Sequence, residues 1–182
     1  MKRHVLLLTT LALLAGCASA PPTRYYTLDM TASGRAEPVV NLTVDRIRPT
    51  EALARKQILV KKSPTEIEYY AVDEWAAGLD ELVAEKLAAE FGPKEEGRKT
   101  IAVSGTILAF EQLDRPDGVE VRVKLDLALR EENDGQYADP LLEKTYETGQ
   151  PAAGPNAVAV VTALSKCLEE IAVQLAADAG AL

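Results

Sequence analysis

One segment, residues 118–131, constrains the fold of this chain more than any other. Its sequence, GVEVRVKLDLALRE, alternates valine or leucine with a mostly charged residue from end to end. Side chains of a β-strand point alternately to opposite faces, so this period of two predicts a strand with one buried and one water-facing side. Residues 100–113 are expected to pair with it as an antiparallel hairpin, because the intervening DRPDG contains Pro116 and Gly118, which suit a tight reversal.

Further strands are expected on both sides of this hairpin. Each is a short segment rich in β-branched or aromatic residues and bounded by Gly, Pro or Asn. They are Arg24–Leu28, Val39–Ile47, two strands within Lys56–Val72 around a turn at Lys62–Thr65, and residues 141–149, which follow a loop opened by Asn133–Gly135.

Two segments have the spacing of amphipathic helices. The first begins after Asp73, a good N-cap residue, and runs to Phe91, where Gly92–Pro93 ends it. The second runs from residue 155 or 156 to Ala177, with apolar residues at steps of three and four. Because most strands are joined by short reversals, we expect an α+β fold in a single domain. It would be a mostly antiparallel β-sheet with two α-helices packed on one face.

The N-terminus has the organisation of a secretory signal peptide. Lys2 and Arg3 precede an apolar run over Val5–Ala15, which is too short to span a membrane. Small residues at 18–20 offer an ordinary cleavage site, but LAGC at Leu14–Cys17 resembles the bacterial lipobox, whose cysteine becomes the acylated first residue. We therefore expect a lipoprotein signal peptide over 1–16, a lipidated cysteine with a flexible Pro-containing tether over 17–24, and one domain over 25–182.

Composition narrows the functions open to the chain. Loss of the basic signal peptide takes the formal charge from −8 to −10, which gives no electrostatic route to nucleic acid and predicts no polybasic face for anionic lipids. The acyl chains, an N-acyl group such as palmitate and an S-diacylglycerol on Cys17, would then hold the protein at the membrane.

Catalytic and metal sites are not expected. The single histidine, His4, lies in the signal peptide, so the domain has no histidine for a zinc site, a nucleophile pair or a general base. No glycine loop for phosphate and no pair of facing carboxylates is recognisable. We predict that the chain is not an enzyme, that it has no metal and no cofactor beyond its covalent lipid, and that Cys167 is a buried, inert thiol on a helix.

Several motifs in order after the lipobox resemble one known family. They are RYYTL at Arg24–Leu28, the Arg-x-Gln-Ile strand at Arg55–Ile58, and WAAGL at Trp75–Leu79, where many relatives carry Glu-Pro between Ala and Leu. This order is similar to that of the ABC-type transport auxiliary lipoproteins, the DUF330-type group that includes PqiC.

The resemblance implies an accessory subunit of an envelope lipid transport system. Its partners would be a periplasmic MCE-domain protein and an ABC-type or PqiA-like permease, and it would dock the MCE tunnel at the outer membrane, facing the periplasm. Ala18, in place of the Asp that retains lipoproteins at the inner membrane in enteric bacteria, agrees with outer-membrane sorting. A homo-oligomer is left open.

Five residues are candidates for partner contact: Tyr25, Tyr26, Gln57, Tyr69 and Tyr70. The alternative is that these motif residues only hold the fold together, and an exposed Tyr25 or Gln57 would favour partner binding. Because Tyr69 and Tyr70 are consecutive in a strand, one of the two rings is expected to be exposed. Two other functions are compatible with the sequence: an assembly or scaffold lipoprotein of another envelope complex, and a small lipid-binding carrier, which would need a large apolar cavity.

Overall fold

The computed structural model describes residues 20–132 and 139–182. The predicted signal peptide, the lipidation site at Cys17, the first residues of the tether and the loop at Asn133–Gly135 lie outside the described residues. In chain order the elements are β1 (Arg24–Tyr26), β2 (Asn41–Pro49), the 3₁₀ helix η1 (Glu51–Leu53), β3 (Gln57–Lys61), β4 (Ile67–Trp75), α2 (Leu79–Phe91), β5 (Thr100–Arg115), β6 (Gly118–Glu131), β7 (Leu142–Pro151) and α3 (Ala157–Gly180).

The alternating segment forms β6 and pairs with β5 along its whole length, from Arg115↔Gly118 to Ile101↔Glu131. Val121, Val123, Leu125 and Leu129 of one face are fully buried, whereas Arg122 and Lys124 of the other are only half-buried. The predicted hairpin and its two-faced strand are therefore confirmed. β7 adds to the other side of β6 in antiparallel register.

The sheet is mixed, so the prediction of a mostly antiparallel sheet is wrong. Seven strands of the described residues form one sheet in the order β1-β4-β3-β5-β6-β7, with β2 also paired to β5. The pairs β1–β4, β2–β5 and β3–β5 are parallel. β3 and β5 run in the same direction because the chain reverses twice between them, first at the β3–β4 hairpin and then through helix α2, which joins the oppositely directed β4 and β5.

β2 and β3 lie one after the other along the same edge of β5. β2 pairs with β5 residues 100–107 and β3 with residues 111–113. The 3₁₀ helix η1 fills the gap between them and buries Leu53. One long strand, β5, thus holds two shorter strands in line and positions the β3–β4 hairpin at one end of the sheet.

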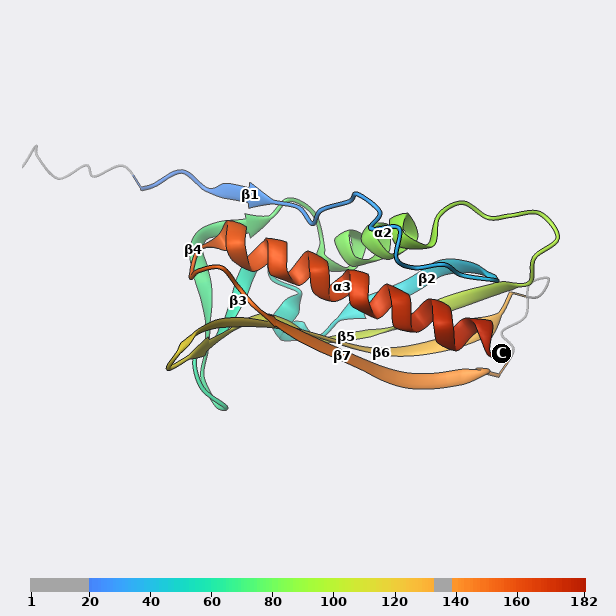
Figure 1. The fold of residues 1–182 in the computed structure, drawn as a ribbon. Helices are drawn as coiled ribbons and strands as arrows, with labels where there is room; N and C mark the ends of the chain where they lie inside the picture. Colours follow the sequence, from blue (N-terminus) through green and yellow to red (C-terminus); the bar gives the residue numbers. More distant parts are fainter. Residues whose placement is uncertain (1–19, 133–138) are drawn as a thin grey trace, which may run out of the picture.

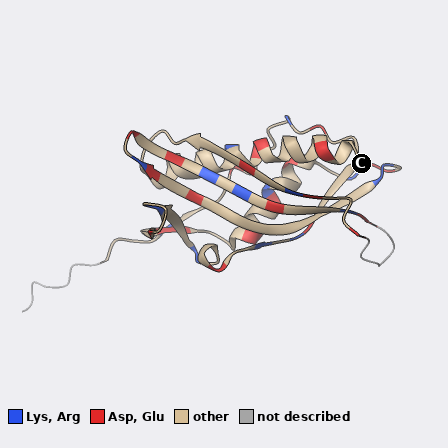
Figure 2. Ribbon diagram, turned by 90° about the horizontal axis from the view of Figure 1, so that it is seen from below, with Lys and Arg blue, Asp and Glu red and all other residues tan. Residues whose placement is uncertain are grey.

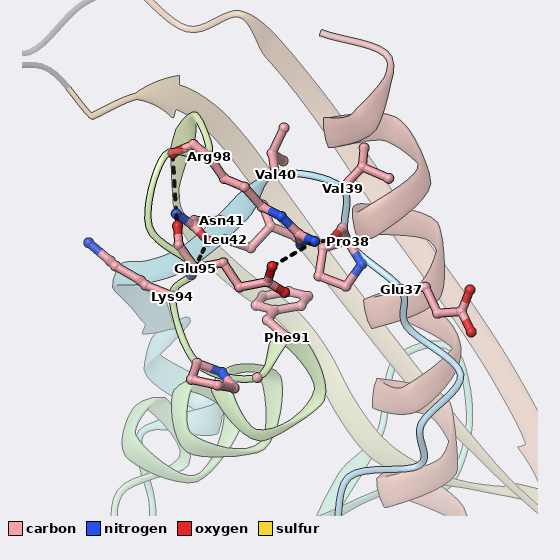
Figure 3. A pocket seen from close by; sticks show the side chains of 12 residues that line it. Glu37, Pro38, Val39, Val40, Asn41, Leu42, Phe91, Lys94, Glu95 and Arg98 are labelled. Atoms are coloured by element: carbon pink, nitrogen blue, oxygen red, sulfur yellow. Dashed lines mark hydrogen bonds and ion pairs between the residues drawn. The ribbon is translucent and has the colours of Figure 1, made fainter.

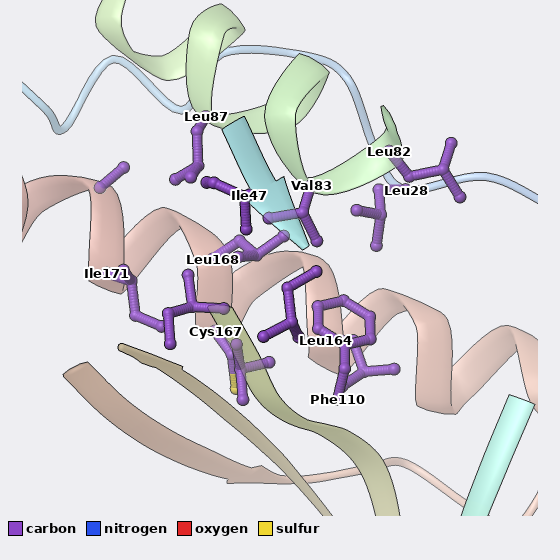
Figure 4. Close-up of a cluster of buried hydrophobic side chains, with 14 of the residues drawn as sticks. Leu28, Ile47, Leu82, Val83, Leu87, Phe110, Leu164, Cys167, Leu168 and Ile171 are labelled. Carbon is purple, nitrogen blue, oxygen red and sulfur yellow. The ribbon is translucent and has the colours of Figure 1, made fainter. Parts of the chain in front are cut away.

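Both helices cover the same face of the sheet, as predicted (Figure 1). α3 lies across β5, β6 and β7, and α2 packs against β2 and against α3. Between the layers lie fully buried side chains from both helices and from the sheet, including Val83, Leu87, Phe110, Leu164 and Ile171 (Figure 4). The α+β class and the single domain are confirmed.

The first helix begins later than predicted. Asp73 and Trp75 belong to the end of β4, and α2 starts at Leu79 with Gly78 as its N-cap residue. The ring of Trp75 is buried edge-to-face against Phe110, with 5.7 Å between the centroids. Gly92 ends the helix as expected, because its φ of 73° is a left-handed conformation that favours glycine.

Residues 27–40 form a segment that we call the strap, which joins β1 to β2 and runs over the two helices (Figure 1). Leu28 is buried against them, and the amide of Asp29 donates a hydrogen bond to Ser165 Oγ of α3 at 3.0 Å. No helix in the described part of the chain is long and apolar enough to cross a membrane.

Candidate partner-binding surface

Four of the five candidate residues lie on β1 and β4, and the fifth, Gln57, begins β3. These strands form the end of the sheet where the N-terminal segment enters the domain (Figure 1). The structure distributes the five residues over three patches, so they do not form one pocket.

Tyr25 and Gln57 share the first patch, which lies across three strands. Both are register partners of Glu74 on β4, Tyr25 from one side and Gln57 from the other. The Gln57 amide donates to Glu74 Oε1 at 3.2 Å. Tyr25 has 64% of its surface exposed, whereas Gln57 is half-buried. An exposed tyrosine next to a hydrogen-bonded carboxylate offers a partner both a ring face and polar groups.

A strong ion pair fixes β1 to the sheet. The guanidinium of Arg24 donates to both carboxylate oxygens of Asp73, at 2.7 and 2.9 Å. Asp73 is almost fully buried, and Arg24 shields it from water with its own head largely exposed. This two-pronged contact holds a strand of only three residues in place and sets the direction of Tyr25.

Tyr26 belongs to the second patch, a shallow groove of about 380 Å³ between the start of the strap and the first turns of α3. Burial, and after it the nearby Asp73 carboxylate, raises the pKa of Tyr26 above its ordinary value. The groove is bordered by Val158, which is 62% exposed, and by Val161. It is an apolar surface that lies directly beside β1.

Tyr69 and Tyr70 line the third patch, an open groove of about 710 Å³ between the β3–β4 hairpin and residues 152–155. Tyr69 donates to the carbonyl of Ala52 at 2.9 Å, and the Arg55 guanidinium lies 4.7 Å from its ring centroid. Tyr70 donates to Gln112 Oε1 at 2.5 Å. Both rings are half-buried, so the expectation that one of them is exposed is wrong.

The reason is an irregularity in the hairpin. β4 advances five residues, from Tyr69 to Glu74, while β3 advances only two, from Gln57 to Leu59. The extra residues break the strict alternation of the strand, and both tyrosines reach the same groove. Its polar rim is ordered, since Lys62 donates to Asp114 at 2.7 Å, and the Lys62 and Gln112 hydrogen bonds lower the pKa of Asp114.

A buried ionic cluster, which we call the latch, was not anticipated from the sequence. Lys86 and Glu90 of α2 have no exposed side-chain surface, and their Nζ and Oε1 atoms are 2.6 Å apart. Lys86 also donates to the carbonyl of Thr31, and Glu90 accepts hydrogen bonds from the amide and the hydroxyl of Ser33. The latch therefore clamps the strap to α2. An (i, i+4) Lys–Glu pair is common on exposed helices, so its sequence gives no signal of burial.

A second anchoring point lies at the opposite end of the sheet, around a pocket of about 380 Å³ (Figure 3). The buried Asn41 side chain donates to the carbonyl of Glu95 and accepts from its amide, at 2.9 and 2.8 Å. Arg98 forms an ion pair with Glu95 and donates to the carbonyl of Pro38. Val39 is 66% exposed here. Both ends of the strap are thus tied to the domain.

Two kinds of reactive group, metal-ligand clusters and reactive thiols, bear on what the described residues can do chemically. In residues 20–132 and 139–182 no three His, Cys, Asp or Glu side chains are grouped so as to hold a metal ion. Cys167 is buried, and burial raises the pKa of its thiol to about 11, so it is not a nucleophile at neutral pH.

Comparison with known proteins identifies the family. The chain belongs to the family of the ABC-type transport auxiliary lipoprotein component, whose model matches residues 26–176. The fold is similar to that of a protein of Xanthomonas campestris assigned to the DUF330 model, with a TM-score of 0.64, 17% identity, and coverage of 84% of this chain and 91% of that one. It is also similar to the crystal structure of an uncharacterized protein, with a TM-score of 0.62, 19% identity and coverage of 87% and 99%. No curated protein matches the chain.

Proposed function

We propose that this protein is a lipid-anchored, non-enzymatic accessory subunit of an envelope lipid transport system. In this proposal Cys17 carries the lipid, the domain faces the periplasm from the outer membrane, and it docks the end of an MCE-domain tunnel that is fed by an ABC-type or PqiA-like permease. Membership of the transport auxiliary family supports the general role.

The observation that carries the proposal is the exposed Tyr25 on β1. In the sheet β1 pairs only with β4 among the described residues, so its other edge is open to a strand of a partner. Arg24 and Asp73 hold β1 rigidly, and a pre-ordered edge loses little entropy on binding. Tyr25 and the adjacent groove at Tyr26 together offer an aromatic and apolar contact surface.

A lipid on Cys17 would keep this surface near the bilayer, because the proposed tether is short. Residues 17–24 are eight residues, which reach no more than about 29 Å when fully extended. Because β1 follows the tether directly, a partner that meets the domain at the membrane encounters the β1 end first. The open Tyr25 edge is therefore the part of the domain that we assign to the MCE-domain protein.

A photo-crosslinking amino acid in place of Tyr25, in the full chain within native membranes, tests the assignment. Val39 is the matched control, since it is 66% exposed against 64% for Tyr25 and lies by the pocket at the other end of the sheet. We expect mass spectrometry to identify an MCE-domain protein from position 25 and not from position 39. Capture of subunits of a different envelope complex would instead support the scaffold alternative.

The carrier alternative predicts a different result. The space between helices and sheet is filled by side chains such as Val83, Leu87 and Leu164, all without exposed surface, which argues for a packed core. Lipid extracted in equimolar amount with the purified protein would favour a carrier.

Lipidation is tested by metabolic labelling with palmitate. Cys17→Ser should abolish the label, and Cys167→Ser should retain it. Equal labelling of both variants would exclude Cys17 as the anchor.

A further inference from the structure

The sheet face away from the helices has a shallow hollow of about 480 Å³ that contains a cluster of arginines. Arg46 and Arg48 come from β2 and Arg130 comes from β6. Ser104 and Gly105 of β5 lie between them, and Asp45 borders the hollow. None of these residues belongs to the β1 surface described above.

Strand order explains why these arginines meet. β5 lies between β2 and β6, and its outward residue at this level is the small Ser104, which is paired with Ala128 of β6. The small side chains leave a trough between Arg46 and Arg48 of β2 on one side and Arg130 of β6 on the other. A bulge between Val44 and Ile47 interrupts β2 here, and Arg46 and Arg48 lie on either side of the inward-facing Ile47.

The positive charge of the hollow is not neutralised by the described residues. Arg46, Arg48 and Arg130 form no ion pair within the parts of the chain that the structure describes. The neighbouring basic residues on the same face behave differently, since Arg122 pairs with Glu111 and Lys124 pairs with Glu147. Figure 2 shows this face, on which acidic and basic residues are interspersed along the strands.

The net charge of the chain gives no hint of this hollow, because an overall charge of −8 predicts no polybasic face. With Asp45 included, the six lining residues still carry a net charge of +2. Arg130 Nη1 donates to Ser104 Oγ at 3.0 Å, which directs its guanidinium over the floor of the hollow. The guanidinium and the hydroxyl group of this hydrogen bond line the same hollow as the two exposed arginines of β2.

We propose that this hollow binds a phosphate group. Arginine presents a planar fork of donors that matches the oxygen spacing of phosphate and can bind it through two parallel hydrogen bonds. Two arginines from β2 and one from β6 would hold the phosphate from opposite sides, and Ser104 would donate from below. The phosphate comes either from a phospholipid head group or from free inorganic phosphate.

Two probes distinguish these sources, both applied to the full-length protein in maltoside micelles. Radiolabelled inorganic phosphate is measured by equilibrium dialysis, and phosphatidylglycerol doped into the micelles is measured by native mass spectrometry. The test variant combines Arg46→Gln, Arg48→Gln and Arg130→Gln. The control variant combines Arg35→Gln, Lys56→Gln and Lys166→Gln, which removes the same charge from exposed positions outside the hollow.

The expected result is retention of binding in the control and loss in the test variant. Each basic residue near anionic phosphate contributes about fivefold in affinity, so the triple substitution should weaken binding by about 100-fold. Binding of phosphatidylglycerol that inorganic phosphate displaces would assign the head group, and binding of inorganic phosphate alone would assign the free ion.

Equal affinity of the test and control variants for both probes would overturn the proposal. So would the absence of binding of either probe to the unmodified protein. No partner protein is present in this experiment, so its failure leaves the proposed docking through Tyr25 untouched.

Discussion

Substitution of Lys86 by methionine is the sharpest test of how the strap is held. Methionine keeps most of the length of the lysine chain but removes the ammonium group. Glu90, which has no exposed surface, then loses its 2.6 Å ion pair and retains only the donors of Ser33, and the carbonyl of Thr31 loses its 2.7 Å donor.

Removal of one partner of a buried pair costs about 3–5 kcal/mol, because an uncompensated charge is left inside the protein. Because Glu90 keeps its hydrogen bonds from Ser33, we expect the cost of Lys86→Met to lie at the lower end of this range, about 3 kcal/mol. At about 2–4 °C per kcal/mol for a chain of this size, the melting temperature should fall by about 6–12 °C. The free energy of unfolding is measured by urea titration of the full-length protein, followed by tryptophan fluorescence of Trp75.

Lys94→Met is the matched control. Lys94 pairs with Glu132 at 2.8 Å, but both side chains are about half exposed, so this change should cost less than about 1 kcal/mol. The double variant Lys86→Met/Glu90→Leu removes both buried charges and should be more stable than Lys86→Met alone. A cost for Lys86→Met no greater than that of Lys94→Met would refute the clamping role of the latch.

Three further predictions concern pH, the thiol and one glycine. Burial alone raises the pKa of Glu90, but hydrogen bonds from Lys86 and Ser33 outweigh it and lower the pKa below 4.5. The stability that depends on the ionised Glu90 is thus complete above pH 4.5 and is lost as the pH falls through the lowered pKa. In Glu90→Gln this contribution is absent, so the free energy of unfolding should fall less steeply with pH below 4.5 than in the unmodified protein. Iodoacetamide at pH 8 should leave Cys167 unmodified until denaturant is added, and rapid labelling of the folded protein would contradict its burial. In Gly105→Ala the new methyl group meets the Asp126 carbonyl, so urea titration should show a loss of about 2–3 kcal/mol in the free energy of unfolding. Gly34→Ala is the control, because its methyl group meets nothing within 4 Å, and it should cost about 1 kcal/mol.

The elements that sequence reasoning predicted best are those with local signals. The alternation in 118–131 identified β6 and its buried face, and the last helix starts where predicted, with Asn156 as its N-cap accepting from the amide of Ala159. Both signals depend on residues close in sequence. Strand partners are not local: β2 pairs with β5 although β3, β4 and α2 lie between them in the chain, so the sequence of β2 alone does not indicate its partner.

Asp73 shows how a local signal can mislead. Its type suits an N-cap, but here its carboxylate lies buried beneath Arg24, a residue 49 positions earlier in the chain. Because Asp73 pairs with Arg24 in the folded protein, it belongs to β4 and not to the start of the helix. The candidate site could not be predicted in full for the same reason. The exposure of Tyr25 depends on strand order, and the shared groove of Tyr69 and Tyr70 depends on a bulge.

In the proposed function, the contacts of β1 and of the strap together fix the chain where it enters the domain. The proposed tether gives directional control only if the chain is fixed where the tether ends, and the described chain is held at two points, by Arg24 on Asp73 and by Ser33 on Glu90. Between these points lies Leu28, buried against the helices. In that proposal a pull from a lipid on Cys17 would act on a strand edge held by the domain and not on a loose segment. The fold thus sets the direction of Tyr25 relative to the sheet, while the arginine hollow lies on the sheet face away from the strap.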